Sequence, residues 1–384
     1  MISHLFKMII NKKKKNFFLL LQLFIAFVAM FFFIGLNLKK FSNYFKPMGY
    51  NYEKAWVVDI DFQNVTEEQE TELSQLVHQK LKGIAEVKAV SVTNVVPFYQ
   101  WGSEQKIKYN KQVSNALAFE VDENFEDVLN IKLTKGRWFS QKDYATNSKP
   151  VIITKDLAER DFPGENPLGK SISINDKPAV IIGISETFKE NTSADVKPGF
   201  FIPMEKAGSK FIINSDQADN FQLLDDKLRK SVSSVGTNQI LIKQLNSLTI
   251  MKKNAHKLDY IQLSISLIVF AFLVLNVFLG VSGVFSYNLS KRKSEVGLRV
   301  AVGASSSDIT KQFLGETMVL TTLGILPGVL IAIQLLIMQQ FDVYYGTLSI
   351  VLSALFLYLL MIACALYPSL KVAKVQPANA LHED

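Results

Sequence analysis

Apolar residues gather into four long blocks along the chain instead of recurring at the spacing of a strand or a surface helix. The blocks are residues 17–36, 260–287, 313–337 and 347–367. A helix of about 20 residues, rising ~1.5 Å per residue, crosses the ~30 Å hydrocarbon core of a bilayer. Lys, Arg, Asp and Glu are absent from these blocks apart from Glu316, near the start of the third. The pattern predicts four transmembrane helices, over residues 17–38, 259–288, 313–337 and 347–367.

The first block follows a run of lysines, Lys12–Lys15, and in this respect resembles a secretory signal peptide. Two features argue against cleavage. The apolar stretch is longer than the about 7–15 residues of a signal-peptide apolar region, and Leu38-Lys39-Lys40 stands where a small-residue cleavage site would lie. We therefore interpret the first block as an uncleaved membrane anchor.

The basic residues that flank the blocks predict the orientation, because cytoplasmic loops of membrane proteins are enriched in Lys and Arg. The residues that set it are Lys7, Lys12–Lys15, Lys291, Arg292, Lys293, Arg299, Lys311, Lys371 and Lys374. Lys39, Lys40 and Lys46 argue for the opposite orientation but are fewer. The segments expected in the cytoplasm are residues 1–16, 289–312 and 368–384. The segments expected outside are residues 39–258 and a short loop, residues 338–346.

The outer segment, residues 39–258, is long enough to fold as a domain. Apolar alternation predicts strands over residues 56–60, 87–93, 150–154, 171–174, 179–184 and 239–243. Two amphipathic helices are expected to bury Leu73, Leu76, Val77 and Leu81 after a capping box at Thr66–Gln69, and Phe221, Leu224, Leu228 and Val232. The order predicts one α/β lobe divided by an inserted, mostly β lobe. The expected fold is therefore an α-helical membrane protein with a two-lobed α/β (α+β) extracytoplasmic domain between helices 1 and 2.

Composition and charge exclude several classes of protein. The bunching of apolar residues excludes an ordinary soluble enzyme, a disordered chain and a nucleic-acid-binding domain. One Cys in the chain excludes a disulfide scaffold and a Cys-based zinc site. The net charge of +7 needs no acidic partner, because basic cytoplasmic loops produce such an excess.

Residues Gly164–Ser171 match the phosphate-loop pattern G-x-x-x-x-G-K-[ST] letter by letter. A working phosphate loop lies between a buried strand and a helix whose N-terminus faces the phosphates. Here residues 159–163 would break a strand, and residues 171–174 alternate as a strand does. The match also falls in the outer segment, so we reject nucleotide binding there.

Other candidate chemistry is sparse. We interpret the histidines, which show no metal-ligand spacing, as surface or interfacial residues: His4, His78, His256 and His382. Cys364 is expected to be a packing residue, Glu316 an interfacial one, and Asp59 and Asp61 a solvated pair. Residues 98–101, Phe-Tyr-Gln-Trp, are either an exposed aromatic loop or part of the core. We expect no catalytic residues, metal or cofactor in this chain.

The most informative segment is the expected cytoplasmic loop, which reads KRKSEVGLRVAVGAS over residues 291–305. It resembles the coupling segment of the MacB/FtsX-like (type VII) ABC transporter permeases, which typically reads basic-x-Glu-Ile-Gly-Ile-Arg-x-Ala-x-Gly-Ala-Ser. The residues that carry this resemblance, and that we expect to couple to an ATPase, are Glu295, Gly297, Leu298, Arg299, Val302, Gly303, Ala304 and Ser305.

Three further segments resemble the same family in its order: residues 121–139, ending in KGRWF; residues 163–170, PGENPLGK, which accounts for the phosphate-loop match; and residues 367–381. Two departures concern Ser306-Ser307, where the family often has basic residues, and His382, where it often has Arg. The resemblance implies a MacB-like periplasmic domain over residues 39–258 and an FtsX-like permease domain over residues 258–384.

The coupling segment also has a physical reading. Glu295, Arg299 and Val302 lie at i, i+4 and i+7 and share a helical face, as a docking helix would require. Gly303 is expected to end this helix, and Ser307-Asp308 to cap the next one. The alternative is a structural juxtamembrane helix whose basic residues meet lipid phosphates.

The resemblance implies a non-catalytic permease half in the bacterial inner membrane, present in two identical or paralogous copies. Each copy would engage a separate cytoplasmic ATPase that binds the ATP and Mg, and ATP-driven motion would reach the outer domain. The work expected is export or extraction of a peptide, lipoprotein, lipid or drug, with a periplasmic or outer-membrane partner also conceivable. The alternatives are a signalling complex that activates an extracytoplasmic partner, such as a cell-wall hydrolase, and a passive membrane-anchored binding protein.

Overall fold

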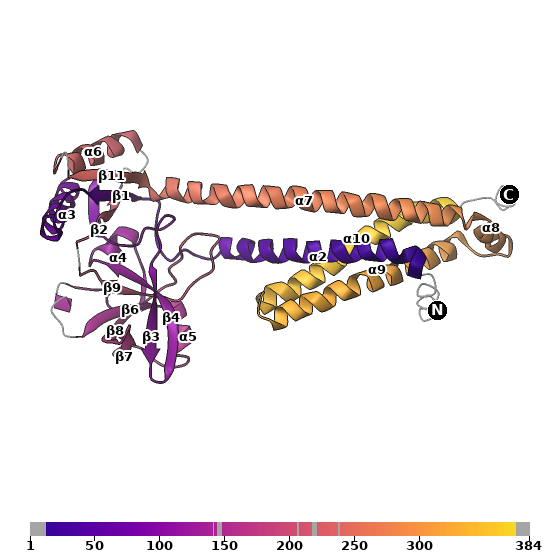
Figure 1. Ribbon diagram of the computed structural model, residues 1–384, viewed down its shortest axis with the longest axis horizontal. Coiled ribbons are helices and arrows are strands. Elements are labelled where there is room, and N and C mark those ends of the chain that lie inside the picture. Colours follow the sequence, from indigo (N-terminus) through magenta and orange to yellow (C-terminus); the bar gives the residue numbers. More distant parts are fainter. Residues whose placement is uncertain are drawn as a thin grey trace. The chain divides into compact units, whose positions relative to one another are not determined.

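A computed structural model describes residues 13–140, 142–143, 148–205, 207–216, 221–236 and 239–373. The chain divides into two compact units: Ser42–Tyr260, which holds the β-sheets, and a helical unit formed by the residues before and after it (Figure 1). The expectations for His4, His382 and the tail beyond residue 373 lie outside the described residues.

The helical unit contains the four long apolar helices. They are α2 (Lys13–Tyr44), α7 (Leu248–Ser290), α9 (Ser306–Ile337) and α10 (Val343–Ala373), and a short helix, α8 (Lys293–Ala301), lies between α7 and α9. Each long helix has the length and hydropathy to cross a membrane, which confirms the prediction of four transmembrane helices. The second begins at Leu248, well before the predicted start at residue 259, because a charged amphipathic stretch extends it into the other unit.

Small residues let two of these helices approach closely. A Cβ atom at Gly324 of α9 would lie 2.7 Å from Cβ of Leu23, and one at Gly328 would lie 2.5 Å from Cδ1 of Phe27, both on α2. Leu23 and Phe27 are fully buried in a core shared by α2, α7, α9 and α10. Close packing of this kind is the main source of helix association in a bilayer. Cys364 is buried in the same core, which confirms its assignment as a packing residue.

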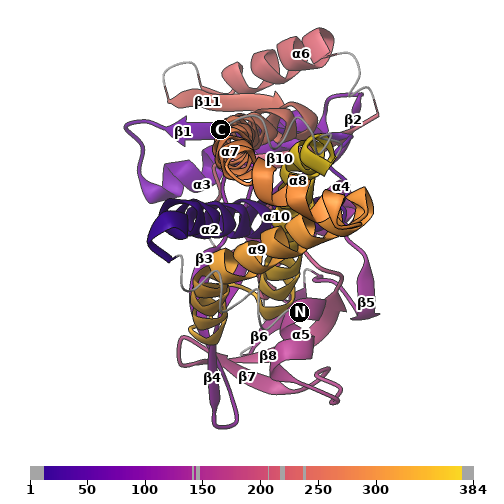
Figure 2. The same cartoon turned by 90° about the vertical axis from the view of Figure 1, so that its right-hand side faces the viewer.

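The outer unit, Ser42–Tyr260, contains two sheets. The four-stranded sheet has the order β11-β1-β10-β2, from strands β1 (Ala55–Phe62), β2 (Val87–Val92), β10 (Lys210–Ser215) and β11 (Ile240–Ser247). Helices α3 (Glu67–Lys82) and α6 (Phe221–Ser233) pack against it, and both views show α6 over β11 (Figures 1 and 2).

The seven-stranded sheet has the order β5-β8-β6-β9-β4-β3-β7. Its strands are β3 (Ser103–Tyr109), β4 (Gln112–Val121), β5 (Leu133–Gly136), β6 (Lys149–Thr154), β7 (Ser171–Ile174), β8 (Lys177–Ser185) and β9 (Gly199–Pro203), with short helices α4 (Phe125–Leu129) and α5 (Lys155–Asp161). All of it lies between β2 and β10 in the chain. The predicted two-lobed domain, an α/β lobe divided by a mostly β insertion, is therefore confirmed.

The two predicted amphipathic helices are present, with one error. Thr66 and Gln69 form the predicted capping box of α3, which buries Leu73, Val77 and Leu81. Leu76 was assigned to the same face, but its side chain is 46% exposed because the four-stranded sheet covers a narrower stripe than the spacing suggested. In α6, Leu224, Leu228 and Val232 are buried as predicted. The side chain of Phe221 is not among those the structure describes.

Two further polar residues are more buried than the sequence suggested. Asp59 on β1 is 4% exposed, and burial raises the pKa of its carboxyl against the opposing effect of Lys210 and Lys243. Its neighbour Asp61 keeps part of its exposure and pairs with Lys243 at 2.8 Å. His256 is 9% exposed. In both cases a strand or loop distant in sequence covers a polar residue, which local patterning does not reveal.

The loop that matches the phosphate-loop pattern has the wrong context for a nucleotide. It follows α5 and leads into β7, so a helix precedes it and a strand follows it. Lys170 forms an ion pair with Glu165 of the same loop and lies 5.2 Å from the ring centroid of Tyr109. The Lys170 ammonium is thus engaged by neighbouring side chains of the outer unit, which supports the rejection of this loop as a nucleotide site.

Of residues 98–101, two side chains belong to the core. Trp101 stacks on Phe188 with ring centroids 5.1 Å apart, and Phe98 packs in the same cluster, whereas Tyr99 is 52% exposed. The core interpretation therefore holds for Phe98 and Trp101.

Candidate functional site

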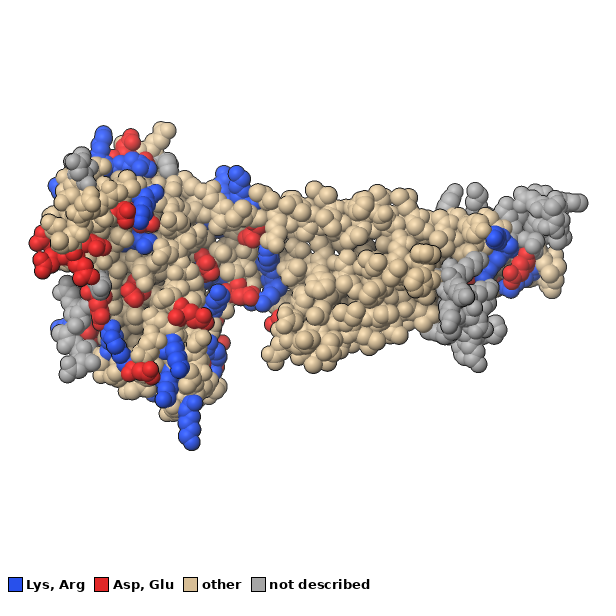
Figure 3. Space-filling model, viewed as in Figure 1, with Lys and Arg blue, Asp and Glu red and all other residues tan. Residues whose placement is uncertain are grey.

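The candidate coupling site lies where α7 ends, in the short helix α8 and the turn that leads into α9. Charged side chains cover the sheet-containing unit and are almost absent from the long helices, but they reappear at this turn (Figure 3). Basic residues are frequent from Lys291 to Arg299, and acidic Glu295 lies among them. The turn therefore presents both charges at the end of an apolar helix.

Helix α8 has one buried and one exposed face. Val296 is 4% exposed, and Gly297 is also buried. On the other face Leu298 is 58% exposed and Val302, just beyond the helix end, is 82% exposed. Exposed aliphatic side chains beside charged ones are typical of a surface that a partner covers.

The charges on the exposed face are paired with one another. Arg299 Nη2 lies 2.5 Å from Glu295 Oε1, and Arg299 Nη1 donates to Gln312 Oε1 of α9 at 2.6 Å. An exposed pair of this kind, one helical turn apart, contributes only about 0.3–0.5 kcal/mol. The guanidinium of Arg299 therefore lies at the surface and can exchange these partners for others at small cost.

A second ion pair joins the turn between α7 and α8 to α9. Arg292 Nη1 lies 2.8 Å from Glu316 Oε2, and the Glu316 side chain is 12% exposed. The sequence suggested an interfacial role for Glu316 but gave no partner for it. The pair lies across 24 residues of chain, and no local spacing rule connects the two positions.

The end of α8 depends on Gly303. Its φ of +103° lies in the region that only glycine adopts without strain, and the N–H of Ala304 donates to the carbonyl of Arg299 at 2.9 Å, a glycine-terminated helix end. A Cβ at Gly303 would meet no atom within 4 Å. Backbone conformation, not space, therefore requires glycine here, as the sequence predicted.

The cap of α9 was assigned wrongly to Ser307-Asp308. The N-cap is Ser305, whose hydroxyl accepts a hydrogen bond from the N–H of Asp308 at 3.2 Å and donates to Asp308 Oδ2 at 2.5 Å. The helix starts earlier because Gly303 turns the chain so tightly that only Ala304 separates it from the cap. Ala304 packs against the helical core, whereas Ser305 is exposed.

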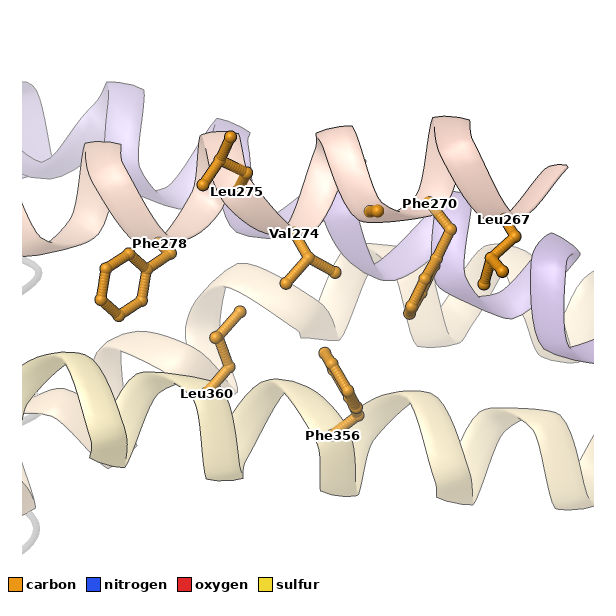
Figure 4. A pocket seen from close by; sticks show the side chains of 8 residues that line it. Leu267, Phe270, Val274, Leu275, Phe278, Phe356 and Leu360 are labelled. Carbon is orange, nitrogen blue, oxygen red and sulfur yellow. The ribbon is translucent and has the colours of Figure 1, made fainter. Parts of the chain in front are cut away.

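A pocket of about 430 Å³ is also present in the helical unit, between α7 and α10 (Figure 4). Its lining is apolar and includes Leu267, Phe270, Val274 and Phe278 of α7 with Phe356 and Leu360 of α10. No titratable or nucleophilic side chain lines it. The pocket therefore offers shape and hydrophobicity but no catalytic chemistry. Within the described residues no group of His, Cys, Asp and Glu is placed to hold a metal ion.

Two family models match this chain. The MacB-like periplasmic core domain matches residues 24–243, and the FtsX-like permease C-terminal domain matches residues 267–377. The first match covers more than half of the chain, and the second contains α8 and the coupling turn. The chain belongs to the MacB/FtsX-like (type VII) ABC transporter permeases.

Curated relatives are of two kinds. The macrolide export ATP-binding/permease protein MacB of Acinetobacter baylyi is 25% identical over 76% of this chain and 46% of its own length. MacB of Psychrobacter cryohalolentis is 24% identical over 74% of this chain and 45% of its own. The chain thus spans about half the length of these relatives. The ABC transporter permease YvrN of Bacillus subtilis is 24% identical, and the match covers 99% of both chains.

Solved structures of extracytoplasmic domains are similar to about half of this chain. The periplasmic region of MacB from Actinobacillus actinomycetemcomitans covers 53% of this chain and 93% of its own, with 17% identity and a TM-score of 0.39. The extracellular domain of the ABC-type transporter YknZ covers 49% and 100%, with 16% identity and a TM-score of 0.36.

Proposed function

We propose that this chain is the permease subunit of an ABC transporter in a bacterial inner membrane. A separate cytoplasmic ATPase docks on α8 and hydrolyses ATP, and the resulting motion is delivered to the outer domain, which lies in the periplasm. Both termini are cytoplasmic, and a second copy, identical or paralogous, completes the transporter. Family membership and the four apolar helices support this arrangement.

The observation that carries the proposal is the exposed face of α8. Leu298 and Val302 are exposed aliphatic residues on a segment that also carries the ion pair Glu295–Arg299. Arg is enriched at protein interfaces, and exposed aliphatic side chains beside it provide apolar area that a partner can cover.

Helix α7 supplies a route for the motion. It continues without a break for 43 residues, a length of ~64 Å at ~1.5 Å per residue. One end follows β11 directly and the other leads through Lys291 and Arg292 into α8. A continuous helix is stiff along its axis, so a displacement at one end is felt at the other.

The proposed work is export or extraction of a peptide, lipoprotein, lipid or drug. The relatives named MacB are macrolide export proteins by name, and the outer unit with two sheets is a large surface for such a cargo. Glu316 is the one Lys, Arg, Asp or Glu residue within the four apolar blocks, and it forms an ion pair with Arg292, which lies in the turn after α7. A polar path through the spans is thus not favoured, and the outer domain is the expected place of substrate contact.

Recovery of the tagged chain from native membranes in mild detergent, followed by mass spectrometry, tests this proposal. We expect a phosphate-loop ATPase to accompany the wild-type chain. Gly303→Leu should lose it, because a leucine with φ near +103° changes the end of α8.

Gly164→Leu is the matched control, since Gly164 also has a positive φ, +75°, with no atom within 4 Å of its Cβ, but lies in the outer unit. Loss of the ATPase in both variants would mean that strain anywhere disrupts the complex. Absence of any ATPase with the wild type would contradict the proposal and favour a passive anchor.

A further inference from the structure

The segment between β8 and β9, residues 186–198 and called the strap here, has an apolar root and a polar tip. At the root, Phe188 is 1% exposed and lies at the centre of an aromatic cluster. Its ring centroid is 4.9 Å from that of Tyr50, 5.1 Å from Trp101, 5.0 Å from Phe119 and 5.2 Å from Phe201. The strap is therefore fixed firmly to the core next to the seven-stranded sheet.

Lys189, the next residue, is fully buried. Its ammonium donates to the carbonyl of Asn43 at 2.7 Å and to the carbonyl of Thr192 at 2.9 Å. Asn43 lies in the last turn of α2, where carbonyls lack partners within the helix and the helix dipole favours a cation. Lys189 thus caps the end of α2 with its side chain. Burial, and secondarily Lys46, lower its pKa to about 8, against the effect of Asp195.

The tip of the strap holds both long helices. Asn43 Nδ2 donates to Asp195 Oδ1 at 2.8 Å, which adds a second bond to the end of α2. The Thr192 hydroxyl lies 2.5 Å from Nε2 of His256, and the Ser193 hydroxyl donates to Asp259 Oδ2 at 2.6 Å. His256 and Asp259 both belong to α7, and all of these residues lie in the outer unit.

Through the adjacent chain alone, a displacement of α2 or α7 would reach only the four-stranded sheet directly. After α2 the chain runs into β1, and α7 follows β11 directly; β1 and β11 are neighbours in the four-stranded sheet. Neither helix is joined by adjacent chain to the seven-stranded sheet. The strap adds a hydrogen-bonded link to the packing of Leu248 and Met251 of α7 in one core cluster with Phe119 and Phe201. It leaves β8 and returns to β9, the strands on either side of β6 in that sheet.

We propose that the strap ties the ends of α2 and α7 to the seven-stranded sheet, with Lys189 as its positioning residue. The inference rests on the proposed function for the source of the motion, whereas the tie itself is a property of the outer unit. A helix displaced at its cytoplasmic end then moves both sheets together.

The tie can be tested without an ATPase by spin-label distance measurements on the full chain in nanodiscs. Cys364→Ala provides a cysteine-free background, because the chain has a single Cys. Labels at Asn254→Cys on α7 and Lys177→Cys on β8, both exposed, report the helix relative to the sheet. A pair at Lys108→Cys and Lys177→Cys reports the fold of the sheet alone.

Two sets of changes loosen the strap in different ways. Lys189→Met removes the cap of α2. Thr192→Val with Ser193→Ala removes the hydrogen bonds to α7, together with the bond from the Ser193 hydroxyl to Asn191 Oδ1 within the strap. In either background we expect the distance distribution between residues 254 and 177 to widen about twofold or more, while that between 108 and 177 stays narrow. Unchanged widths in both backgrounds would overturn the tie. Broadening of the 108–177 distribution in both would show a folding role instead and would also overturn it.

A second measurement distinguishes a strap that transmits motion from α7 to the seven-stranded sheet from a strap that only stabilises the fold. With the ATPase recovered in the pull-down, amide exchange is compared with and without trapped ATP. In the wild type, exchange should change in residues 248–260 and in β8 and β9; in Thr192→Val/Ser193→Ala only the helix should respond. A response of β8 and β9 that persists in this variant would refute transmission through the strap. If the wild-type helix itself does not respond, the proposed function is wrong, and the spin-label result still decides the tie.

Discussion

Two short segments, the coupling turn of α8 and the strap, are both attached to α7 but are built in opposite ways. In the coupling turn the side chains face outward: Leu298 and Val302 are 58% and 82% exposed. In the strap they face inward, with Phe188 at 1% and Lys189 fully buried. The contrast fits the proposed docking of another chain on the first segment, whereas the second packs within this chain.

The energetics of the charged groups follow the same contrast. The pair Glu295–Arg299 is exposed, contributes little, and can exchange its partners for those of a docked protein at small cost. Lys189 has left water, and two carbonyl acceptors offset that cost. Removing a partner from a buried group is far more destabilising than removing one from an exposed pair.

The largest expected effect is on docking at the coupling turn. Val302→Asp places a charge on the most exposed apolar residue of the turn, and its burial against a partner would cost about 2 kcal/mol or more, roughly 30-fold in affinity. Titration of the purified chain with the recovered ATPase measures this loss. Val113→Asp, at an exposed strand position of the outer unit, should bind as the wild type does. Equal affinity of the wild type, Val302→Asp and Val113→Asp for the ATPase would contradict docking on the exposed face of α8.

The next effect is on the stability of the outer unit. Lys189→Met removes this donor from the carbonyls of Asn43 and Thr192. The Asn43 carbonyl still accepts from the N–H of Lys46 at 3.1 Å, so the cost is about 1–3 kcal/mol at Thr192 and less at Asn43, partly offset because a charge is no longer buried. We expect the melting temperature, measured by near-UV circular dichroism of the aromatic cluster, to fall by about 5 °C. Arg299→Met, at the exposed pair, should shift it by less than about 1 °C. A larger fall in melting temperature for Arg299→Met than for Lys189→Met would contradict the difference drawn between the exposed pair and the buried lysine.

A smaller effect is expected with pH. Because the pKa of Lys189 is lowered to about 8 in the folded chain, the unfolded chain binds more protons between pH 8 and the ordinary lysine value of 10.5. Stability should therefore rise with pH across this window, by at most about 1.4 kcal/mol per pH unit. The free energy of unfolding of the wild type and of Lys189→Met is measured in denaturant melts at several pH values. The difference between the two pH dependences gives the contribution of Lys189. Parallel curves would show that Lys189 keeps an ordinary pKa.

The smallest expected effect concerns the cap of α9. Ser305→Ala removes the acceptor for the N–H of Asp308 and should cost about 1 kcal/mol, so ATPase binding weakens by about fivefold or less. Ser305→Asp keeps a good N-cap residue and should bind as the wild type does. An equal loss in both variants would show that the Ser305 hydroxyl contacts the ATPase itself.

The sequence predicts the coupling turn much better than the strap, for a physical reason. The turn is local: Glu295 and Arg299 are one helical turn apart, and Gly303 and Ser305 mark a helix end and a helix start. The four spans are also local, because each is a single apolar block. Lys189, by contrast, lies in a polar loop and reads as a solvated lysine, while its acceptor Asn43 is 146 residues away.

The same limit applies to the burial of His256 and Asp59. His256 is covered by Thr192 of the strap, 64 residues earlier, and Asp59 lies opposite Lys210 in a strand pairing. Strand β10, which supplies Lys210, was itself missed, because its short apolar run has no alternation to distinguish it. Contacts of this kind depend on how distant segments pack, and one sequence does not encode them as a local pattern.

The central claim, that the exposed face of α8 binds an ATPase, is tested most directly by photocrosslinking in intact membranes. A photoreactive amino acid replaces Val302, and the same residue at Val113 in the outer unit serves as the reference. We predict that the chain labelled at position 302 crosslinks to a phosphate-loop ATPase and that the chain labelled at 113 does not. Crosslinks from position 302 to lipid alone, with no ATPase, would contradict the account.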